Sequence, residues 1–280
     1  MPQDSVVYIV NLIIGAILAG LMTQHWRLDS GGLSLRYWIL AAWILTAADL
    51  LFAVRPLLHG WLRYLPTLMV TAGHATLWLA AQRTADRPSH PRIATTIVLA
   101  HAAFLVTMLI VAPDSNWRTV VNGVIWGGLS IAAAVELRRG PQALRWIMFV
   151  PMLVLAAQGA FHAVRTALAT RIVVAPNADG NALVQLLGDL EVSLFMVALF
   201  VSVLVAYLRR SNVELRTAMK DVKQLAGLLP LCAWCKKVRD DDGYWTQLEQ
   251  YLEEHRIHVT HGICESCETK LLASKEAAAS

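Results

Sequence analysis

Long apolar stretches constrain this chain more than any other feature. A helix that crosses a bilayer needs about 20 mostly apolar residues, and seven stretches of roughly this length are separated by short polar breaks. They cover residues 6–23, 37–54, 65–81, 93–112, 120–137, 146–167 and 190–208. The breaks contain turn residues such as Ser30-Gly31-Gly32 and Gly140-Pro141. The sequence therefore predicts an all-α membrane protein with a domain of seven transmembrane helices over residues 1–208.

Composition supports this class and divides the chain into two regions. Apolar residues make up 56% and charged residues 16% of the chain, whereas soluble domains average about 45–50% and about 25%. Every lysine lies at or beyond Lys220, so in the apolar region before it the positively charged side chains are all arginines. The net charge of +4 does not indicate a nucleic-acid partner, because acidic residues outnumber basic ones between Cys232 and Cys267.

Arginines predict the orientation of the spans in an inner (plasma) membrane. With the N-terminus outside, the cytoplasmic loops and tail contain Arg27, Arg36, Arg83, Arg87, Arg92, Arg138, Arg139, Arg145, Arg209, Arg210 and Arg216. The outer loops and helix ends contain fewer, namely Arg55, Arg63, Arg118, Arg165 and Arg171. The positive-inside rule then places the C-terminus in the cytoplasm. No basic residue precedes the first stretch, which favours an uncleaved span over a signal peptide.

Four cysteines follow the apolar region as two Cys-x-x-Cys pairs, Cys232/Cys235 and Cys264/Cys267. Disulfides are rare in a reducing cytoplasm, and zinc favours four thiolates in a tetrahedron. We therefore expect a structural zinc ion as cofactor, held by all four. Free buried thiols and a thiol redox switch are the alternatives. A catalytic zinc is disfavoured because four thiolates leave no open position.

The residues around the cysteines predict a small fold. Asp242-Gly243 is a turn signal between short extended pieces, and Thr246 can cap a following helix. A last helix after the second pair completes a treble-clef-like zinc module over residues 230–275, followed by a disordered tail, 276–280. So small a unit buries too little apolar surface to fold without metal. Trp234, Tyr244 and Trp245 are candidates for a partner surface, or for the module's own core.

The run LPLCAWCKKVRDDDGYWTQLEQYLEEH, followed by HGICESC, closely resembles a cysteine module found at the end of many bacterial signalling proteins. In those proteins it follows PAS, GAF or receiver domains, or membrane sensor regions. The similarity covers about residues 228–272. The seven-span region looks like the membrane half of bacterial diguanylate cyclases by general pattern only, and the chain lacks their GGDEF-like catalytic domain. The resemblance implies a signalling context and a cytoplasmic signalling partner rather than catalysis.

Residues 209–229 connect the two regions. Leu215, Met219, Val222 and Leu225 recur at helical spacing with charges between them, and Pro230 ends the pattern. This predicts an amphipathic helix whose apolar seam joins two chains as a homodimer. The alternative is a helix lying on the inner leaflet, with its basic residues at the lipid headgroups.

Ionisable residues within spans mark candidate functional sites. Asp49 lies in the second stretch, Glu191 begins the seventh, and Gln158, His162 and Arg165 share one face of the sixth. These residues lie at a similar depth in the outer half of the membrane. We therefore expect a pocket that opens to the outside and binds a small polar or anionic ligand through Arg165. The alternative is that they only join helices or snorkel to the interface.

His74 and His101 lie near the middle of the third and fourth stretches. Together with His162 they could bind haem, so a membrane electron carrier is a rival function. The seventh stretch has no lysine for a retinal Schiff base, and no nucleophile–base spacing indicates an enzyme. The sequence therefore predicts a non-enzymatic membrane sensor that couples the bundle to the zinc module.

Overall fold

The computed structural model describes residues 3–29, 33–112, 116–174, 178–226, 231–239, 243, 245–254 and 262–277. The chain divides into two compact units, Met1–Glu214 and Leu215–Ser280. Helix dominates both units, and the described strands are a single short pair in the second.

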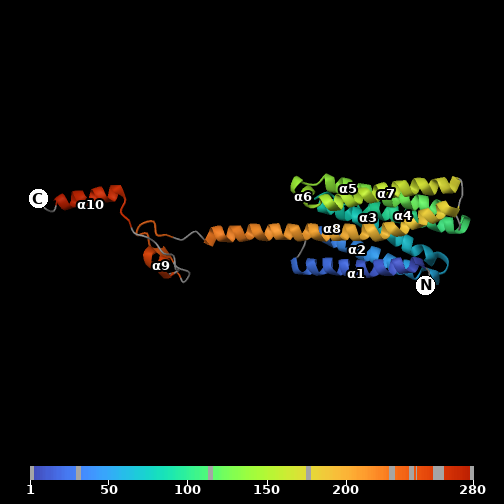
Figure 1. Cartoon of the computed structure of the whole chain (residues 1–280), viewed down its shortest axis with the longest axis horizontal. Helices are drawn as coiled ribbons and strands as arrows, with labels where there is room; N and C mark the ends of the chain where they lie inside the picture. Colours follow the sequence, from blue (N-terminus) through green and yellow to red (C-terminus); the bar gives the residue numbers. More distant parts are fainter. Residues whose placement is uncertain are drawn as a thin grey trace. The chain divides into compact units, whose positions relative to one another are not determined.

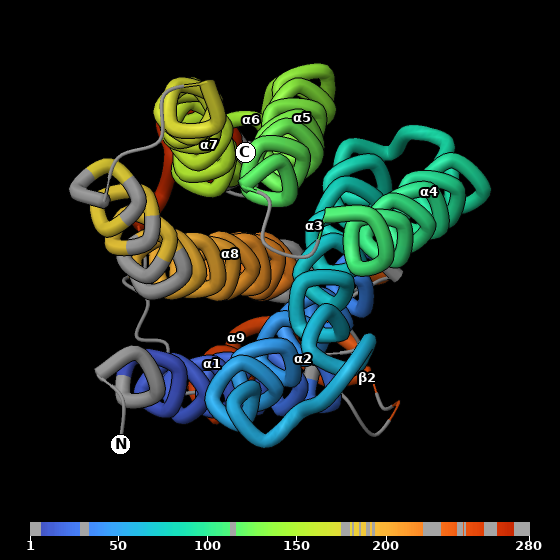
Figure 2. Tube along the Cα trace, turned by 90° about the vertical axis from the view of Figure 1, so that its right-hand side faces the viewer, coloured from blue at the N-terminus to red at the C-terminus, as the bar shows by residue number. Residues whose placement is uncertain are grey.

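Seven long helices run along one another in the first unit (Figures 1 and 2). They are α1 (Gln3–Asp29), α2 (Leu33–Ala53), α3 (Leu65–Thr84), α4 (Pro91–Val111), α5 (Trp117–Arg138), α7 (Phe149–Val174) and α8 (Ala178–Ala226). Short 3₁₀ turns, η1 (Arg55–Leu57) and η2 (Gly60–Tyr64), join α2 to α3, and the short α6 (Gln142–Ile147) precedes α7. These long helices correspond to the seven predicted stretches.

Six of these helices are long and apolar enough to cross a membrane: α1, α2, α4, α5, α7 and α8. The remaining long helix, α3, carries buried polar residues along its length, among them Thr71, His74 and Gln82. It packs against α2, α4 and α5 near the centre of the bundle. A helix surrounded by protein can carry more polar residues than one that faces lipid, which fits the burial of the polar side chains of α3. The chain is a multi-span helical membrane protein.

Helix ends differ from the predicted stretches. Helix α1 continues to Asp29, and α8 begins at Ala178 rather than near residue 190. Apolar composition identifies only the part of a helix that can lie in lipid. A helix that continues beyond its apolar stretch is therefore longer in the structure than the sequence predicts. The predicted span at 146–167 begins instead at Phe149, because the turn at Met148 separates it from α6.

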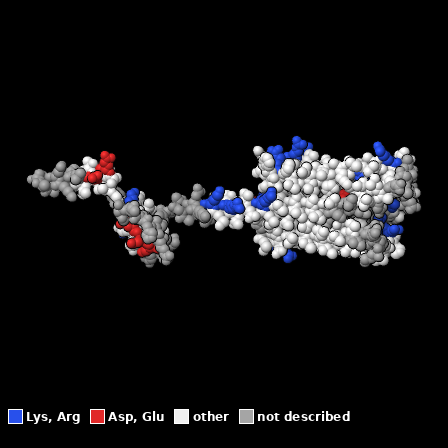
Figure 3. Space-filling view, viewed as in Figure 1, with Lys and Arg blue, Asp and Glu red and all other residues white. Residues whose placement is uncertain are grey.

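The core of the first unit joins α1, α2, α3, α5, α7 and α8 around fully buried side chains such as Trp38 and Phe200. Trp38 Nε1 donates to Thr84 Oγ1 at 2.9 Å, and the Tyr207 hydroxyl donates to Ser34 Oγ at 2.9 Å, so polar bonds link α2, α3 and α8. Large apolar side chains such as Ile17, Leu99 and Leu153 are exposed on the bundle, and on the face in Figure 3 charged side chains are few and basic ones gather mainly towards its ends. This is the surface expected of a bundle in lipid.

The second unit begins within α8 and contains β1 (Val238–Arg239), β2 (Trp245–Thr246), α9 (Leu248–Glu254) and α10 (Glu265–Ala277). The strands are antiparallel, with Val238 opposite Thr246. The predicted extended pieces and both helices are confirmed. Val238 is the one fully buried apolar residue among the described residues of this unit. Helix α10 includes residues 276–277 of the predicted disordered tail, and residues 278–280 lie outside the described residues.

Candidate functional site

A cavity of about 300 Å³ lies inside the bundle. Its lining includes Tyr8 near the start of α1, Arg55 after α2, Tyr64 before α3 and Arg118 at the start of α5. These positions share one end of the bundle, the end that carries the start of α1. From there the lining reaches inwards to His74 and other residues in the middle of the helices.

Four of the five predicted pocket residues, Asp49, Gln158, Arg165 and Glu191, line this cavity. The fifth, His162, is fully buried, and its Nε2 lies 3.0 Å from Glu191 Oε1. Helices α2, α7 and α8 thus bring the predicted set together. Asp49 is buried, and its Oδ2 has no hydrogen-bond partner among the described residues.

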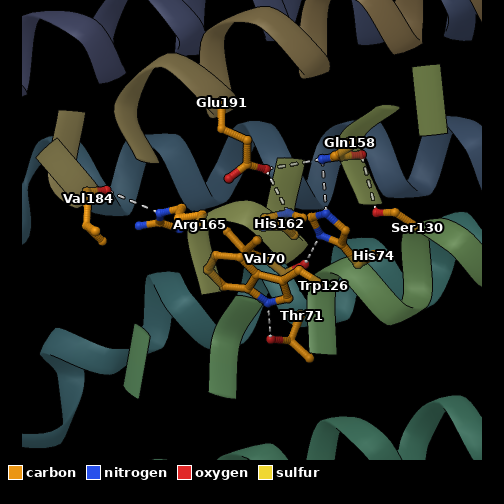
Figure 4. Close-up of polar contacts among 10 residues, drawn as sticks. All are labelled: Val70, Thr71, His74, Trp126, Ser130, Gln158, His162, Arg165, Val184 and Glu191. Atoms are coloured by element: carbon orange, nitrogen blue, oxygen red, sulfur yellow. Dashed lines mark hydrogen bonds and ion pairs between the residues drawn. The ribbon is translucent and has the colours of Figure 1, made fainter. Parts of the chain in front are cut away.

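A polar cluster of His74, Gln158, His162 and Glu191 forms part of the cavity wall and the layer behind it (Figure 4). The Gln158 amide nitrogen lies 3.3 Å from both Glu191 Oε1 and His74 Nε2, and Ser130 Oγ donates to Gln158 Oε1 at 3.4 Å. Trp126 stacks on the His74 ring at 5.9 Å and meets the His162 ring edge-on at 5.8 Å. Side chains from α3, α5, α7 and α8 therefore enclose one small polar volume.

Sequence reasoning did not include His74 in this cluster. The histidine lies on α3, which packs against α2 and α5 in the structure. The sequence does not show this packing, so it could not place His74 beside the other three residues. The available signal was the run of polar residues Thr67, Thr71 and His74, which recur at helical spacing on a stretch that is otherwise apolar.

His101 belongs to a separate polar network. Its Nδ1 lies 2.7 Å from Thr71 Oγ1 and its Nε2 lies 2.9 Å from Asn122 Oδ1, while Trp126 Nε1 donates to the same Thr71 oxygen at 2.8 Å. Both ring nitrogens therefore have hydrogen-bond partners, and haem ligation by His101 would require one of them to move.

Arginines give the cavity a positive wall. Arg55, Arg118 and Arg165 all line it, and Arg165 Nε donates to the carbonyl of Val184 at 3.2 Å. Gly188 of α8 leaves the room that this guanidinium occupies, because a Cβ at Gly188 would lie 2.5 Å from an Arg165 nitrogen. Guanidinium groups in an enclosed volume favour anionic groups such as carboxylates and phosphates.

The cysteine pairs form a second candidate site, and each pair lies on a hydrogen-bonded turn. Lys236 N–H donates to Cys232 O at 3.0 Å and Cys232 N–H donates to Lys237 O at 2.8 Å. In the second pair, Cys267 N–H donates to Cys264 O at 2.9 Å at the start of α10. Such turns bring the two sulfurs of a pair together, so the pairs can bind a metal.

Local hydrogen bonds favour the thiolate forms, which are the forms that bind metal. The backbone N–H of Cys235 lowers the pKa of Cys232 below its ordinary value. The Ser266 hydroxyl, 3.2 Å from Cys264 Sγ, is the main cause that lowers the pKa of Cys264 to about 7. A substantial fraction of Cys264 is therefore thiolate near neutral pH.

Of the predicted partner surface, Trp234 is 94% exposed and Trp245 is 48% exposed. Tyr244 lies outside the described residues. Trp234 therefore does not contribute to a core, and its use as a contact for a partner stays a prediction.

Comparisons of the chain with protein-family models, with curated proteins and with solved structures found no match.

Proposed function

We propose that this protein is a non-enzymatic membrane sensor in which helix α8 carries a signal from the bundle to the cysteine unit. One observation supports this most: Gly188 and Glu191 of α8 line the cavity, and the same helix continues without a break to Ala226, in the unit that contains the cysteines. A change at the cavity wall that moves α8 would reach that unit through backbone hydrogen bonds alone.

The stimulus in this proposal is a small anion that enters the cavity. Three arginines line it, and Arg165 lies beside α8 at Gly188. An anion that pairs with Arg165 would compete with the Val184 carbonyl for the guanidinium, and Val184 is also part of α8. A ligand that binds two arrangements of α8 unequally shifts the population between them.

In the proposed topology all seven long helices cross the membrane, with the N-terminus outside and the C-terminus in the cytoplasm. Helix α3 has 20 residues, enough to span the hydrocarbon core. Its partners cover most of its polar side chains, so it need not meet the apolar threshold that a lipid-facing helix meets.

The cysteine unit in this proposal is a treble-clef-like module in which Cys232, Cys235, Cys264 and Cys267 share one structural zinc. Its scarcity of buried apolar residues supports metal as the main source of stability. Zinc content by elemental mass spectrometry tests this: a Cys232→Ser/Cys264→Ser variant should contain about one zinc per chain less than the unmodified protein. Reduced protein without tail zinc would contradict it.

Exposed residues of α8 support a homodimer. Val213, Leu215 and Met219 each expose more than half of their side chain beyond the bundle core. Cysteine introduced at Leu215, with the four native cysteines replaced by serine, should crosslink two chains in membranes. Equal crosslinking from the charged face, at Arg216, would indicate random collision instead.

A thiol redox switch is the second candidate function, supported by the exposure of Cys235, Cys264 and Cys267 on the two Cys-x-x-Cys turns and by the lowered pKa values of Cys232 and Cys264. Cytosolic oxidation would join each pair as a disulfide and expel the metal. Thiol labelling before and after peroxide separates the two functions, because a fixed structural site keeps its zinc and its labelling pattern.

The sensor proposal is tested with full-length protein in lipid nanodiscs and with acetate, succinate and inorganic phosphate as probe anions. We expect at least one probe to change hydrogen exchange over residues 209–226. Arg165→Ala should abolish the change, whereas Arg171→Ala, on the same helix but not in the cavity lining, should keep it. No response to any probe, or an unchanged response in Arg165→Ala, would contradict the proposal.

A further inference from the structure

We infer that His74, His162 and Glu191 form a binding site for a divalent first-row transition-metal ion inside the bundle. Each residue offers a ligand atom within 4.8 Å of the other two, and all three side chains are buried. Two imidazoles with one carboxylate are a ligand set for zinc and for iron(II). The site is separate from the cysteine pairs, and binding at it does not depend on the signalling role proposed above.

His74 is already oriented as a metal ligand. Its Nδ1 lies 2.9 Å from the Val70 carbonyl oxygen, and because that oxygen only accepts, Nδ1 carries the proton. In the neutral ring the Nε2 lone pair then points away from Val70, towards Gln158 and Glu191 (Figure 4). Metal-bound histidines commonly donate their other N–H to a backbone carbonyl in this way, which fixes the tautomer and the ring plane.

Gln158 marks the region where the lone pairs converge. Its amide nitrogen lies 3.3 Å from both His74 Nε2 and Glu191 Oε1, so one donor faces two ligand atoms from different helices. A cation in this region would take the place of that donor. The amide needs only to turn aside, because its oxygen is held by Ser130 through a long 3.4 Å bond.

His162 supplies an independent observation. The ring is fully buried, and although its Nε2 lies 3.0 Å from Glu191 Oε1, neither ring nitrogen makes a well-aligned hydrogen bond. Hydrogen bonds weaken steeply off axis, so this contact satisfies Nε2 only in part. A buried imidazole without a well-aligned hydrogen bond among the described residues is unfavourable, and a metal ion beside Glu191 would satisfy its Nε2.

The spacing and the charge fit an ion of this kind. Bonds of about 2.0–2.2 Å place the ligand atoms of a tetrahedral zinc roughly 3–3.5 Å apart; the His162–Glu191 pair already meets this. Glu191 provides the compensating negative charge, and Arg165 directs its Nε at Val184 instead of this carboxylate. Three protein ligands leave one position open, and His74 and Glu191 line the cavity, so water or an anionic ligand reaches that position from the cavity.

The test uses the full chain with all four cysteines replaced by serine, so that the tail binds no metal. Protein in detergent is stripped with a chelator, loaded with zinc, and its metal content is measured by elemental mass spectrometry. We expect about one zinc per chain. Glu191→Gln preserves size and removes the carboxylate, and it should weaken zinc binding at least about tenfold, since even outer partners of a metal site contribute 10–100-fold.

Asp49→Asn is the matched control, because Asp49 is a buried carboxyl group on the same cavity that is not part of the three-residue group. It should keep the zinc. His74→Gln serves as a second variant, with folding checked by size-exclusion chromatography. Absence of zinc in the serine background, or equal affinity in Glu191→Gln, overturns the inference. Zinc content is measured independently of hydrogen exchange in α8, so loss of this site and failure of the sensor proposal are told apart.

Discussion

The two units of this chain obtain a defined structure in different ways. The bundle buries large apolar side chains such as Trp38, Phe200 and Leu155 and pairs most of its buried polar groups across helices. Among its described residues the cysteine unit fully buries one apolar side chain, Val238, and leaves Trp234 almost wholly exposed. Packing therefore accounts for the bundle, whereas the described part of the cysteine unit has little apolar core and contains two Cys-x-x-Cys pairs that can bind a metal.

This contrast also separates the two candidate metal sites. In the bundle, His74 and His162 lie on helices that share a large apolar core, so a metal there would add to an existing fold. In the tail, metal would supply the fold itself, because so few apolar contacts are available. Metal removal should therefore affect the two units very unequally.

The largest expected effect is the loss of the tail fold. Cys232→Ser removes one of four ligands, and since zinc contributes about 10–16 kcal/mol of apparent binding free energy in zinc-finger peptides, residues 231–277 should lose protection from proteolysis. The bundle should stay intact. Trp234→Ala, at an exposed position of the same turn, is the control and should leave protection unchanged. Equal protection in the serine variant would show that the tail folds without metal.

A large effect is expected at the α5–α7 contact. A Cβ at Gly127 would lie 2.8 Å from His162 Cβ, whereas a Cβ at the neighbouring Gly128 meets nothing within 4 Å. Gly127→Ala should destabilise the bundle by about 1–2 kcal/mol, because overpacking exceeds the helix-propensity gain of about 0.5–1 kcal/mol. Gly128→Ala should be neutral or stabilising. Thermal unfolding in detergent measures both, and the opposite order would contradict this packing.

A smaller effect is expected from one buried hydrogen bond. Trp38→Phe removes the donor to Thr84 Oγ1 and should cost about 1 kcal/mol of bundle stability. Trp43→Phe is the comparison, since Trp43 bonds Thr23 at 3.2 Å from an exposed position and should cost less. Chemical unfolding of the two variants tests this; a larger loss in Trp43→Phe would be inconsistent with it.

The smallest effect concerns pH. In metal-free protein the pKa of Cys264 is about 7, below the ordinary value of 9.0, chiefly because of the Ser266 hydroxyl. The thiolate fraction, and with it the alkylation rate, should rise with pH and reach half its maximum near pH 7. Ser266→Ala should move the midpoint upwards. Mass spectrometry of alkylated peptides gives both curves, and identical midpoints would assign the low pKa to another group.

Much of the fold was predictable because lipid imposes a strong pattern. Apolar stretches located all seven long helices, and turn signals located the strand pair around Val238 and Trp245. Helix ends were not predictable, as α8 shows: the apolar run begins near residue 190, but the helix begins at Ala178. Segments that extend beyond the bilayer carry no apolar signature.

Prediction of the site was partial for a different reason. Spacing on α7 grouped Gln158, His162 and Arg165, because residues on one helix have a fixed relation. Nothing in the sequence says which helix packs opposite them, so His74 on α3 was not assigned to the group. Hydrogen-bond partners such as the Val70 carbonyl, which fixes the tautomer of His74, depend on side-chain geometry and lie beyond sequence reasoning.

The central claim is that α8 transmits a change in the bundle to the cysteine unit, and breaking α8 tests it most directly. Asn212 lies in α8 just before the boundary between the units, and proline there costs about 3 kcal/mol or more of local helix stability. In nanodiscs with the probe anions, Asn212→Pro should still bind through the bundle but show no change in hydrogen exchange over residues 215–226. Asn212→Ala should respond like the wild type. A wild-type response in Asn212→Pro would contradict transmission through this helix.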